Sequence, residues 1–175
     1  SPAATPTAIS LLHGKVTKVD SGDAFTALIT DGSTERVRLV GIDAPDPDQV
    51  WGDKSYFALA ALLNGKDVVI RFRGRDAYGR ILGRVIADGK DVGLTQLTNG
   101  NAWYMKADAP QLTPPARKLY PAAEASAKKN RIGLWADPAP VSPWDFRKGT
   151  GASELKTFEE KSEVKQPDGF FGRVT

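Results

Sequence analysis

Two arginines and two aspartates occur together in one short stretch, residues 36–46, which reads RVRLVGIDAPD. Its β-branched residues predict a strand that delivers Arg38 and then ends in a turn carrying Asp43 and Asp46. Strand burial favours apolar side chains, so charges of both signs in one short region indicate a site for an anion together with a cation. The alternative is an edge strand with a solvated charged face, followed by a polar turn.

The same residue types would suit the hydrolysis of a phosphodiester bond. Asp23 and Asp43 are candidate metal ligands, because carboxylates from neighbouring strands offer the hard oxygens that Ca²⁺ prefers. Arg38 and Arg80 are candidates for binding phosphate, since a guanidinium donates paired, charge-assisted hydrogen bonds to such an anion. Asp46 is the remaining carboxylate, and it could orient or deprotonate the attacking water.

Each assignment has a structural alternative. The aspartates could be solvated turn residues, and Arg38 could form a surface ion pair with Glu35 or an aspartate. Arg38 and Asp43 are also five residues apart, so strict alternation along a strand would place them on opposite faces. The functional interpretation therefore requires a bulge or bend between Val40 and Asp43, which Gly41 would permit.

The composition excludes several classes of protein. The chain of 175 residues has no cysteine, which removes disulfides, thiolate metal sites and cysteine nucleophiles. Its single histidine, His13, argues against a zinc site or a histidine-based triad. No apolar run approaches the ~18 residues of a membrane-spanning helix. The net charge of +3, with acids in excess over residues 151–175, leaves a mildly basic body that is compatible with a polyanionic partner.

The chain divides into one domain with flanking segments. Residues 1–7, SPAATPT, resemble what remains after removal of a signal peptide, although an arbitrary boundary would look the same, and we expect a secreted or periplasmic protein. Residues 8–137 form the predicted domain. Residues 138–175 form a Pro-rich and then charged tail.

Alternation and turn signals predict five strands, in residues 9–19, 23–30, the 36–46 stretch, 66–74 and 81–87. Helical spacing predicts three helices, near residues 56–63, 94–97 and 113–130. A helix between the third and fourth strands, with further helices later, predicts an α+β domain built on a small barrel. The five-stranded OB-fold β-barrel is one solution for such a chain.

The order of the motifs resembles the staphylococcal nuclease (thermonuclease) family. The resemblance covers roughly residues 14–135 and rests on Asp23, Arg38, Gly41-Ile42-Asp43-Ala44-Pro45, Tyr78-Gly79-Arg80, Glu124-Ala125 and Gly133-Leu134-Trp135. It implies an OB-fold barrel with three α-helices and a Ca²⁺-dependent endonuclease or exonuclease acting on DNA and RNA. In that family water attacks phosphorus and the 5′ oxygen leaves, which gives 3′-phosphate ends. We expect a monomer that prefers single-stranded substrates.

The resemblance also implies a role for each matching residue. Asp23 and Asp43 match the calcium carboxylates, and Ala44 matches a position whose backbone carbonyl binds the metal. Arg38 and Arg80 match the phosphate-binding arginines. Tyr78 matches a substrate-binding tyrosine, and Asp46 matches the general-base glutamate.

Three departures from the family pattern bear on activity. Asp46 is one methylene shorter than the usual glutamate, and misplacement by about 1 Å can cost about a hundredfold in rate. The usual Asp-Gly-Asp-Thr reads SGDA at residues 21–24, which removes an acid and a hydroxyl near the metal. Lys106 and Asp108 stand where the best-known member has tyrosines that flank the substrate. We therefore predict a nuclease with reduced activity.

Two other functions remain open. The chain could be a catalytically impaired module that binds nucleic acid through Arg71, Arg73, Arg75 and Arg80, with an affinity that falls as salt rises. It could also be a protein-interaction OB domain whose acidic tail engages a partner.

Overall fold

A computed structural model describes residues 8–149 of the chain. It divides into two units, the first ending at Pro140 and the second beginning at Val141. The predicted leader, residues 1–7, and residues 150–175 of the predicted tail lie outside the described residues.

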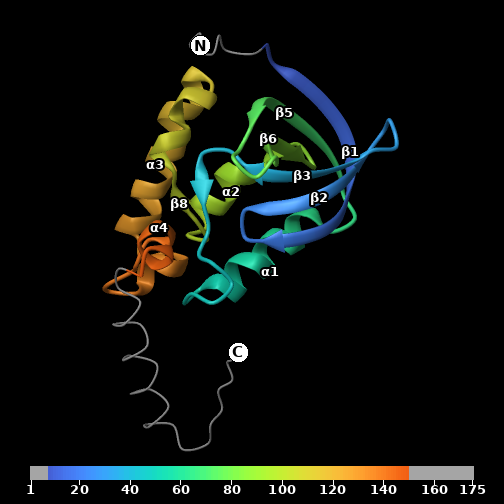
Figure 1. The fold of residues 1–175 in the computed structure, drawn as a ribbon. Helices are drawn as coiled ribbons and strands as arrows, with labels where there is room; N and C mark the ends of the chain where they lie inside the picture. Colours follow the sequence, from blue (N-terminus) through green and yellow to red (C-terminus); the bar gives the residue numbers. More distant parts are fainter. Residues whose placement is uncertain (1–7, 150–175) are drawn as a thin grey trace, which may run out of the picture. The chain divides into compact units, whose positions relative to one another are not determined.

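Five strands of the first unit form a closed barrel (Figure 1). They pair in the order β3-β2-β1-β5-β6, and a parallel pairing of β3 with β6 closes the sheet. The two-residue strand β7 (Lys90–Asp91) extends β6 as a hairpin. The five-stranded OB-fold barrel predicted from the sequence is therefore confirmed, with strands β1 (Ser10–Ser21), β2 (Ala24–Ile29), β3 (Thr34–Leu39), β5 (Asp67–Arg75) and β6 (Ile81–Ala87).

Alternation along the strands separates the core from the charges. In β3, Val37 and Leu39 are buried in the barrel, while Arg36 and Arg38 alternate with them and face outward. The barrel interior is filled by side chains such as Phe25, which is fully buried. Arg38, which is predicted to bind phosphate, consequently lies on the outer side of the barrel wall.

Three helices pack around the barrel, as predicted (Figure 1). Helix α1 (Gly52–Leu63) lies against β1, and α2 (Val92–Thr98) lies between β6 and α3 (Pro114–Lys129). The start of α3 follows from its sequence, because Thr113 caps the amide of Ala116 and two prolines occupy the first turn. Two 3₁₀ segments complete the unit, η1 (Lys106–Gln111) and η2 (Gly133–Ala136).

The chain bends at Gly41, as the spacing of Arg38 and Asp43 required. Strand β3 ends at Leu39, Gly41 has a φ of 85°, and the two-residue strand β4 (Ile42–Asp43) pairs instead with β8 (Trp103–Tyr104). A Cβ at position 41 would also come within 2.8 Å of the Tyr120 ring. The bend therefore needs glycine for its backbone conformation and for the close approach of α3.

The second unit contains a short helix that the sequence did not predict. Helix α4 (Pro143–Arg147) is capped by the Ser142 side chain, which accepts a hydrogen bond from the Asp145 amide. Within residues 8–149, no helix combines the length and the apolar character needed to cross a membrane.

Candidate active site

Two buried aspartates predicted to bind metal are brought together by the bend at Gly41. Asp23 is the second residue of the tight turn between β1 and β2, and Asp43 ends β4. The Asp23 Oδ2 atom accepts a hydrogen bond of 2.9 Å from the Ala44 amide, and its Oδ1 accepts one of 2.8 Å from the Ser21 hydroxyl. The Asp23 carboxylate therefore contacts the residue that follows Asp43, although 21 positions separate Asp23 from Ala44.

The carboxylate oxygens of Asp23 and Asp43 are the type of ligand that a hard cation prefers. Asp23 and Asp43 are 9% and 4% exposed, and a buried carboxylate is stabilised by a cation. Residues 8–149 contain no group of three acidic, histidine or cysteine side chains that could hold a metal. A cation bound here would therefore depend on two carboxylates together with backbone and water oxygens, which Ca²⁺ accepts.

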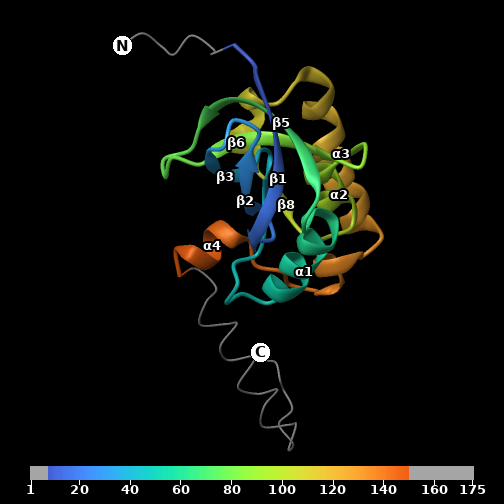
Figure 2. The ribbon, with the colours of Figure 1, turned by 90° about the vertical axis from the view of Figure 1, so that its right-hand side faces the viewer.

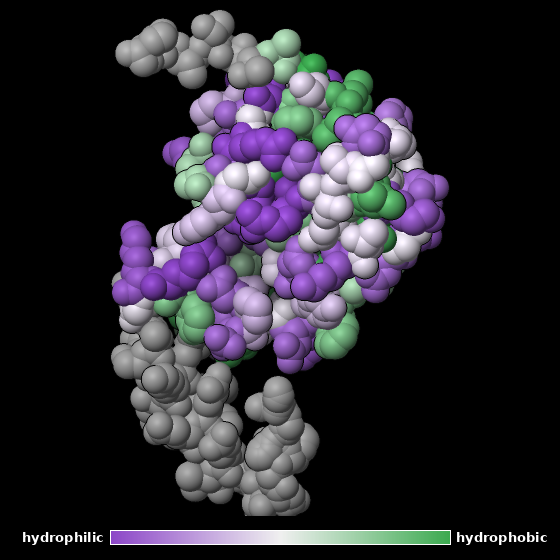
Figure 3. All heavy atoms as spheres, turned by 45° about the vertical axis from the view of Figure 1, so that its right-hand side comes forward, coloured by the Kyte–Doolittle hydropathy of each residue, from purple (hydrophilic) through white to green (hydrophobic). Residues whose placement is uncertain are grey.

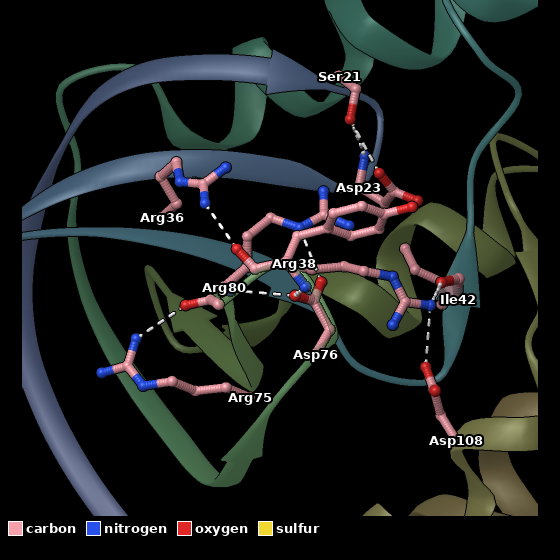
Figure 4. Close-up of polar contacts among 11 residues, drawn as sticks. Ser21, Asp23, Arg36, Arg38, Ile42, Arg75, Asp76, Arg80 and Asp108 are labelled. Atoms are coloured by element: carbon pink, nitrogen blue, oxygen red, sulfur yellow. Dashed lines mark hydrogen bonds and ion pairs between the residues drawn. The ribbon is translucent and has the colours of Figure 1, made fainter.

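Arg38 lies in the sheet between the two other predicted site segments. Its cross-strand partners are Ala24 of β2, next to Asp23, and Leu82 of β6, two residues beyond Arg80. Figure 4 shows the side chains of Arg38 and Arg80 beside each other, with Asp23 nearby. The register of three strands thus collects a buried acid and two arginines at one place on the barrel.

The Arg38 guanidinium is held along one edge. Its Nη2 atom donates to Asp108 Oδ2 at 3.0 Å and to the Ile42 carbonyl at 2.9 Å. Both side chains of this ion pair are only 12% exposed. The Nε and Nη1 atoms of Arg38 have no hydrogen-bond partner within residues 8–149, so they can donate to an anion.

Asp76 holds Arg80 in a similar way. Its Oδ2 accepts from Arg80 Nε at 2.7 Å, and its Oδ1 accepts from the Tyr78 and Arg80 amides at 2.9 and 3.0 Å. Burial raises the pKa of Asp76, but the bonds from the two amides and the guanidinium lower it by more, so the pKa lies below its usual 3.8. The loop that carries Arg80 is therefore built around this carboxylate.

Two further arginines tie the same loop to the barrel. Arg36 donates to the Tyr78 carbonyl at 2.8 Å, and Arg75 donates to the Gly79 carbonyl at 3.0 Å. Arg75 also pairs with Glu35, and this hydrogen bond holds the pKa of Glu35 below its usual value.

Figure 2 shows the loop between β5 and β6 projecting from the barrel. Figure 3 shows a band of strongly hydrophilic side chains on one face of the molecule.

Tyr78 and Asp46 complete the predicted set. Tyr78 is 74% exposed, and the Arg80 guanidinium lies 5.6 Å from its ring centroid. Asp46 is half-buried in the turn before α1, where its amide donates to Gln49 Oε1 and its carbonyl accepts from the Gln49 amide. A Cβ at Gly52 would lie 2.0 Å from the Asp46 carbonyl, so this turn is packed tightly on the start of α1. The backbone of Asp46 therefore has a fixed place three residues beyond Asp43.

The carboxylates that hold the arginines were not identified from the sequence. The alternative of an ion pair between Arg38 and an aspartate is confirmed, because Arg38 pairs with Asp108, although both side chains are largely buried. The pair with Glu35 is wrong, because Glu35 pairs with Arg75. Asp108, which the resemblance matched to a tyrosine of the best-known family member, is 9% exposed and also accepts from the Gly41 amide at 2.8 Å. Asp76 could have been found, since it lies four residues before Arg80 in a turn-forming segment.

Replacing Asp76 by Asn tests its role directly. The side-chain oxygen of Asn can still accept from the loop amides, so the variant removes mainly the charge opposite Arg80. We expect a loss of about 1–2 kcal/mol in the free energy of unfolding, measured by urea titration near neutral pH. The KM for substrate should rise, because Arg80 is no longer held.

The dependence of this loss on pH has a defined sign. Folding lowers the pKa of Asp76, so its stabilisation is fully present above the unfolded pKa, near 3.8, and is lost as the pH falls through the folded pKa. The stability difference between the wild type and Asp76→Asn should therefore shrink below about pH 3.8. A difference that stays constant in acid would show that the carboxylate charge is not responsible.

Several known proteins are similar in sequence to most of this chain. A family model described as "Staphylococcal nuclease homologue" matches residues 36–137. An Escherichia coli protein named "Uncharacterized endonuclease" is 36% identical over 137 residues, which covers 78% of this chain and 85% of that protein. A Shigella flexneri protein named "Micrococcal nuclease" is 34% identical over 147 residues, covering 79% and 82% respectively. A Haemophilus influenzae protein, also named "Uncharacterized endonuclease", is 33% identical over 134 residues, covering 77% and 72%.

Proposed function

This chain belongs to the staphylococcal nuclease family, and on that premise we propose that it is a calcium-dependent nuclease that cleaves DNA and RNA by in-line attack of water on phosphorus. The 5′ oxygen would leave, which gives 3′-phosphate ends. The shortened general base would make the enzyme slower than family members that carry glutamate.

The observation that carries the proposal is the way in which the two arginines are held. Arg38 and Arg80 each use one edge of the guanidinium to bind a carboxylate, Asp108 and Asp76 respectively, and keep other nitrogens open. Donors fixed in advance can stabilise the charge that develops on a phosphoryl group without reorganising during the reaction. A purely structural ion pair would have no need for two such half-engaged arginines beside the buried Asp23.

Each remaining residue has a defined task in this proposal. Asp23, Asp43 and the Ala44 carbonyl would hold calcium, which supplies Lewis-acid polarisation of a phosphoryl oxygen when bound. Asp46 would orient or deprotonate the attacking water. Tyr78, exposed beside Arg80, offers a ring on which an unpaired base can stack, which favours single-stranded substrates.

The direct test is hydrolysis of single-stranded DNA and RNA with added Ca²⁺ and, separately, with EDTA. We expect cleavage with calcium, loss of cleavage with EDTA, and products that carry 3′-phosphates. Cleavage that persists in EDTA would contradict the calcium requirement. Salt-sensitive binding without any turnover at high protein concentration would favour the impaired binding module instead.

A melting experiment separates metal binding from catalysis. A ligand that binds only the folded state raises its stability, by about 2.7 kcal/mol at a hundred times Kd. Calcium should therefore raise the Tm of the wild type and have much less effect on Asp23→Asn or Asp43→Asn. An equal shift in all three proteins would place the calcium site elsewhere.

A further inference from the structure

Three arginines, Arg71, Arg73 and Arg84, gather on the outer side of β5 and β6. Arg71 lies directly opposite Arg84 in the antiparallel ladder, and Arg73 lies at the irregularity in register between Phe72 and Gly74. All three line one small hollow between these strands and the segment that leads into α3. The other lining residues are Ile9, Val40, Phe72, Gln111, Leu112 and Thr113.

The positive charge of this cluster is only partly compensated. Arg84 donates to Asp91 Oδ2 at 2.9 Å, and Asp91 also accepts from the Tyr120 hydroxyl. The side chains of Arg71 and Arg73 have no hydrogen-bond or ion-pair partner within residues 8–149, and no acid lines the hollow. Like charges opposite each other in a sheet are destabilising. An anion bound here would therefore reduce the repulsion between the opposed guanidiniums of Arg71 and Arg84.

The cluster is continuous with the proposed phosphate site. Leu82 and Arg84 lie on one side of β6, and Arg80 immediately precedes this strand, so about 13 Å of extended chain separates the backbones of Arg80 and Arg84. Leu82 is also the parallel partner of Arg38, and Val40, two residues after Arg38, lines the hollow. A polyanion leaving the proposed active site along β6 would therefore meet Arg73, Arg71 and Arg84 next.

The size of the hollow limits what can enter it. Its volume of about 30 Å³ has room for a group the size of a water molecule, such as a phosphate oxygen. The start of α3 does not compete for this anion, because Pro114 and Pro115 have no amide hydrogen and Thr113 already caps the Ala116 amide. Recognition is left to the guanidiniums, which contact backbone phosphate irrespective of base sequence.

We propose that Arg71, Arg73 and Arg84 form a second phosphate subsite, which binds the backbone of a single-stranded polynucleotide beyond the scissile bond. The inference rests on the proposed function only in taking a polynucleotide as the ligand. It assigns to this surface the choice of long substrates over short ones.

The test compares binding of a long and a short oligonucleotide, about 20 and about 3 nucleotides, to the full chain. Fluorescence anisotropy in EDTA measures affinity without cleavage. The double variant Arg71→Gln/Arg73→Gln should bind the long oligonucleotide about tenfold or more weakly and the short one nearly unchanged. Loss of two phosphate contacts should also lower the slope of log affinity against log salt by about 1.4.

Two control variants keep the test specific. Lys129→Gln/Arg131→Gln removes the same charge at the far end of α3, about 24 Å along the helix, and should change neither affinity nor slope appreciably. Arg71→Lys/Arg73→Lys keeps the charge and should retain most of the binding. Arg84 is left unchanged, because its removal would leave the buried Asp91 carboxylate without its counter-charge.

Several outcomes would overturn the subsite. Unchanged affinity for the long oligonucleotide, equal weakening of both lengths, or equal weakening by the control at the end of α3 would each do so. If the wild type cleaves DNA and the double variant still binds normally, the proposed function stands and only the subsite fails. A wild type that neither cleaves nor binds would remove both.

Discussion

Arg38→Ala should lower kcat for DNA hydrolysis by about 10²–10³-fold, which is the usual cost of removing one preorganised donor to a developing negative charge. Arg38 lies in β3 between β2 and β6, the strands that directly follow Asp23 and Arg80, and part of its guanidinium is open. Because this interaction would strengthen in the transition state, kcat should fall much more than KM rises. A change confined to KM would reduce Arg38 to a binding role.

The same variant should also be less stable, and this effect must be separated from catalysis. Removing Arg38 leaves Asp108 buried without its counter-charge, which costs about 3 kcal/mol. The double variant Arg38→Ala/Asp108→Asn removes that charge, and its amide oxygen can still accept from the Gly41 amide. We expect the double variant to regain most of the stability in urea unfolding and none of the activity.

Arg80→Ala provides the matched comparison. Its partner Asp76 is also bonded to two loop amides, so the carboxylate keeps hydrogen bonds when the guanidinium is removed. The loss of activity should resemble that of Arg38→Ala, with a smaller loss of stability. If activity followed stability across these variants, the arginines would be structural.

Asp46→Glu should raise kcat by up to about a hundredfold. The variant restores the missing methylene, and a carboxylate misplaced by about 1 Å can cost that factor. The backbone at Asp46 is fixed by Gln49 and by the tight contact with Gly52, so the substitution changes mainly the reach of the carboxylate. Single-turnover hydrolysis with saturating calcium is the suitable measurement, since it isolates the chemical step from product release.

Asp46→Asn is the control for this gain. It keeps the size of the side chain and removes its basicity, so activity should fall below that of the wild type. If Asn and Asp support the same rate, Asp46 is not the base, whatever Glu does. An unchanged kcat in Asp46→Glu, together with a fall in Asp46→Asn, would mean that Asp46 is already well placed.

Local features of the sequence determined the elements that present the site. Alternation along β3 puts Val37 inside and Arg38 outside, and this follows from strand geometry alone. The need for a bend at Gly41 follows from the odd spacing of Arg38 and Asp43, and the structure has the bend there. These predictions succeed because each depends on a few neighbouring residues and on the limited conformations of the backbone.

Contacts between distant segments were decided by the tertiary structure. Asp108 lies 70 residues from Arg38, and it reaches that arginine only because β8 pairs with β4 and so places η1 against the end of β3. The partners of Arg75 and Arg84 were likewise not predicted. The sequence could show which side chains point out of the barrel, because the alternation along a strand depends only on neighbouring residues. The pairing of a given acid with a given arginine depends on which distant segments pack against each other, and only the tertiary structure determines that packing.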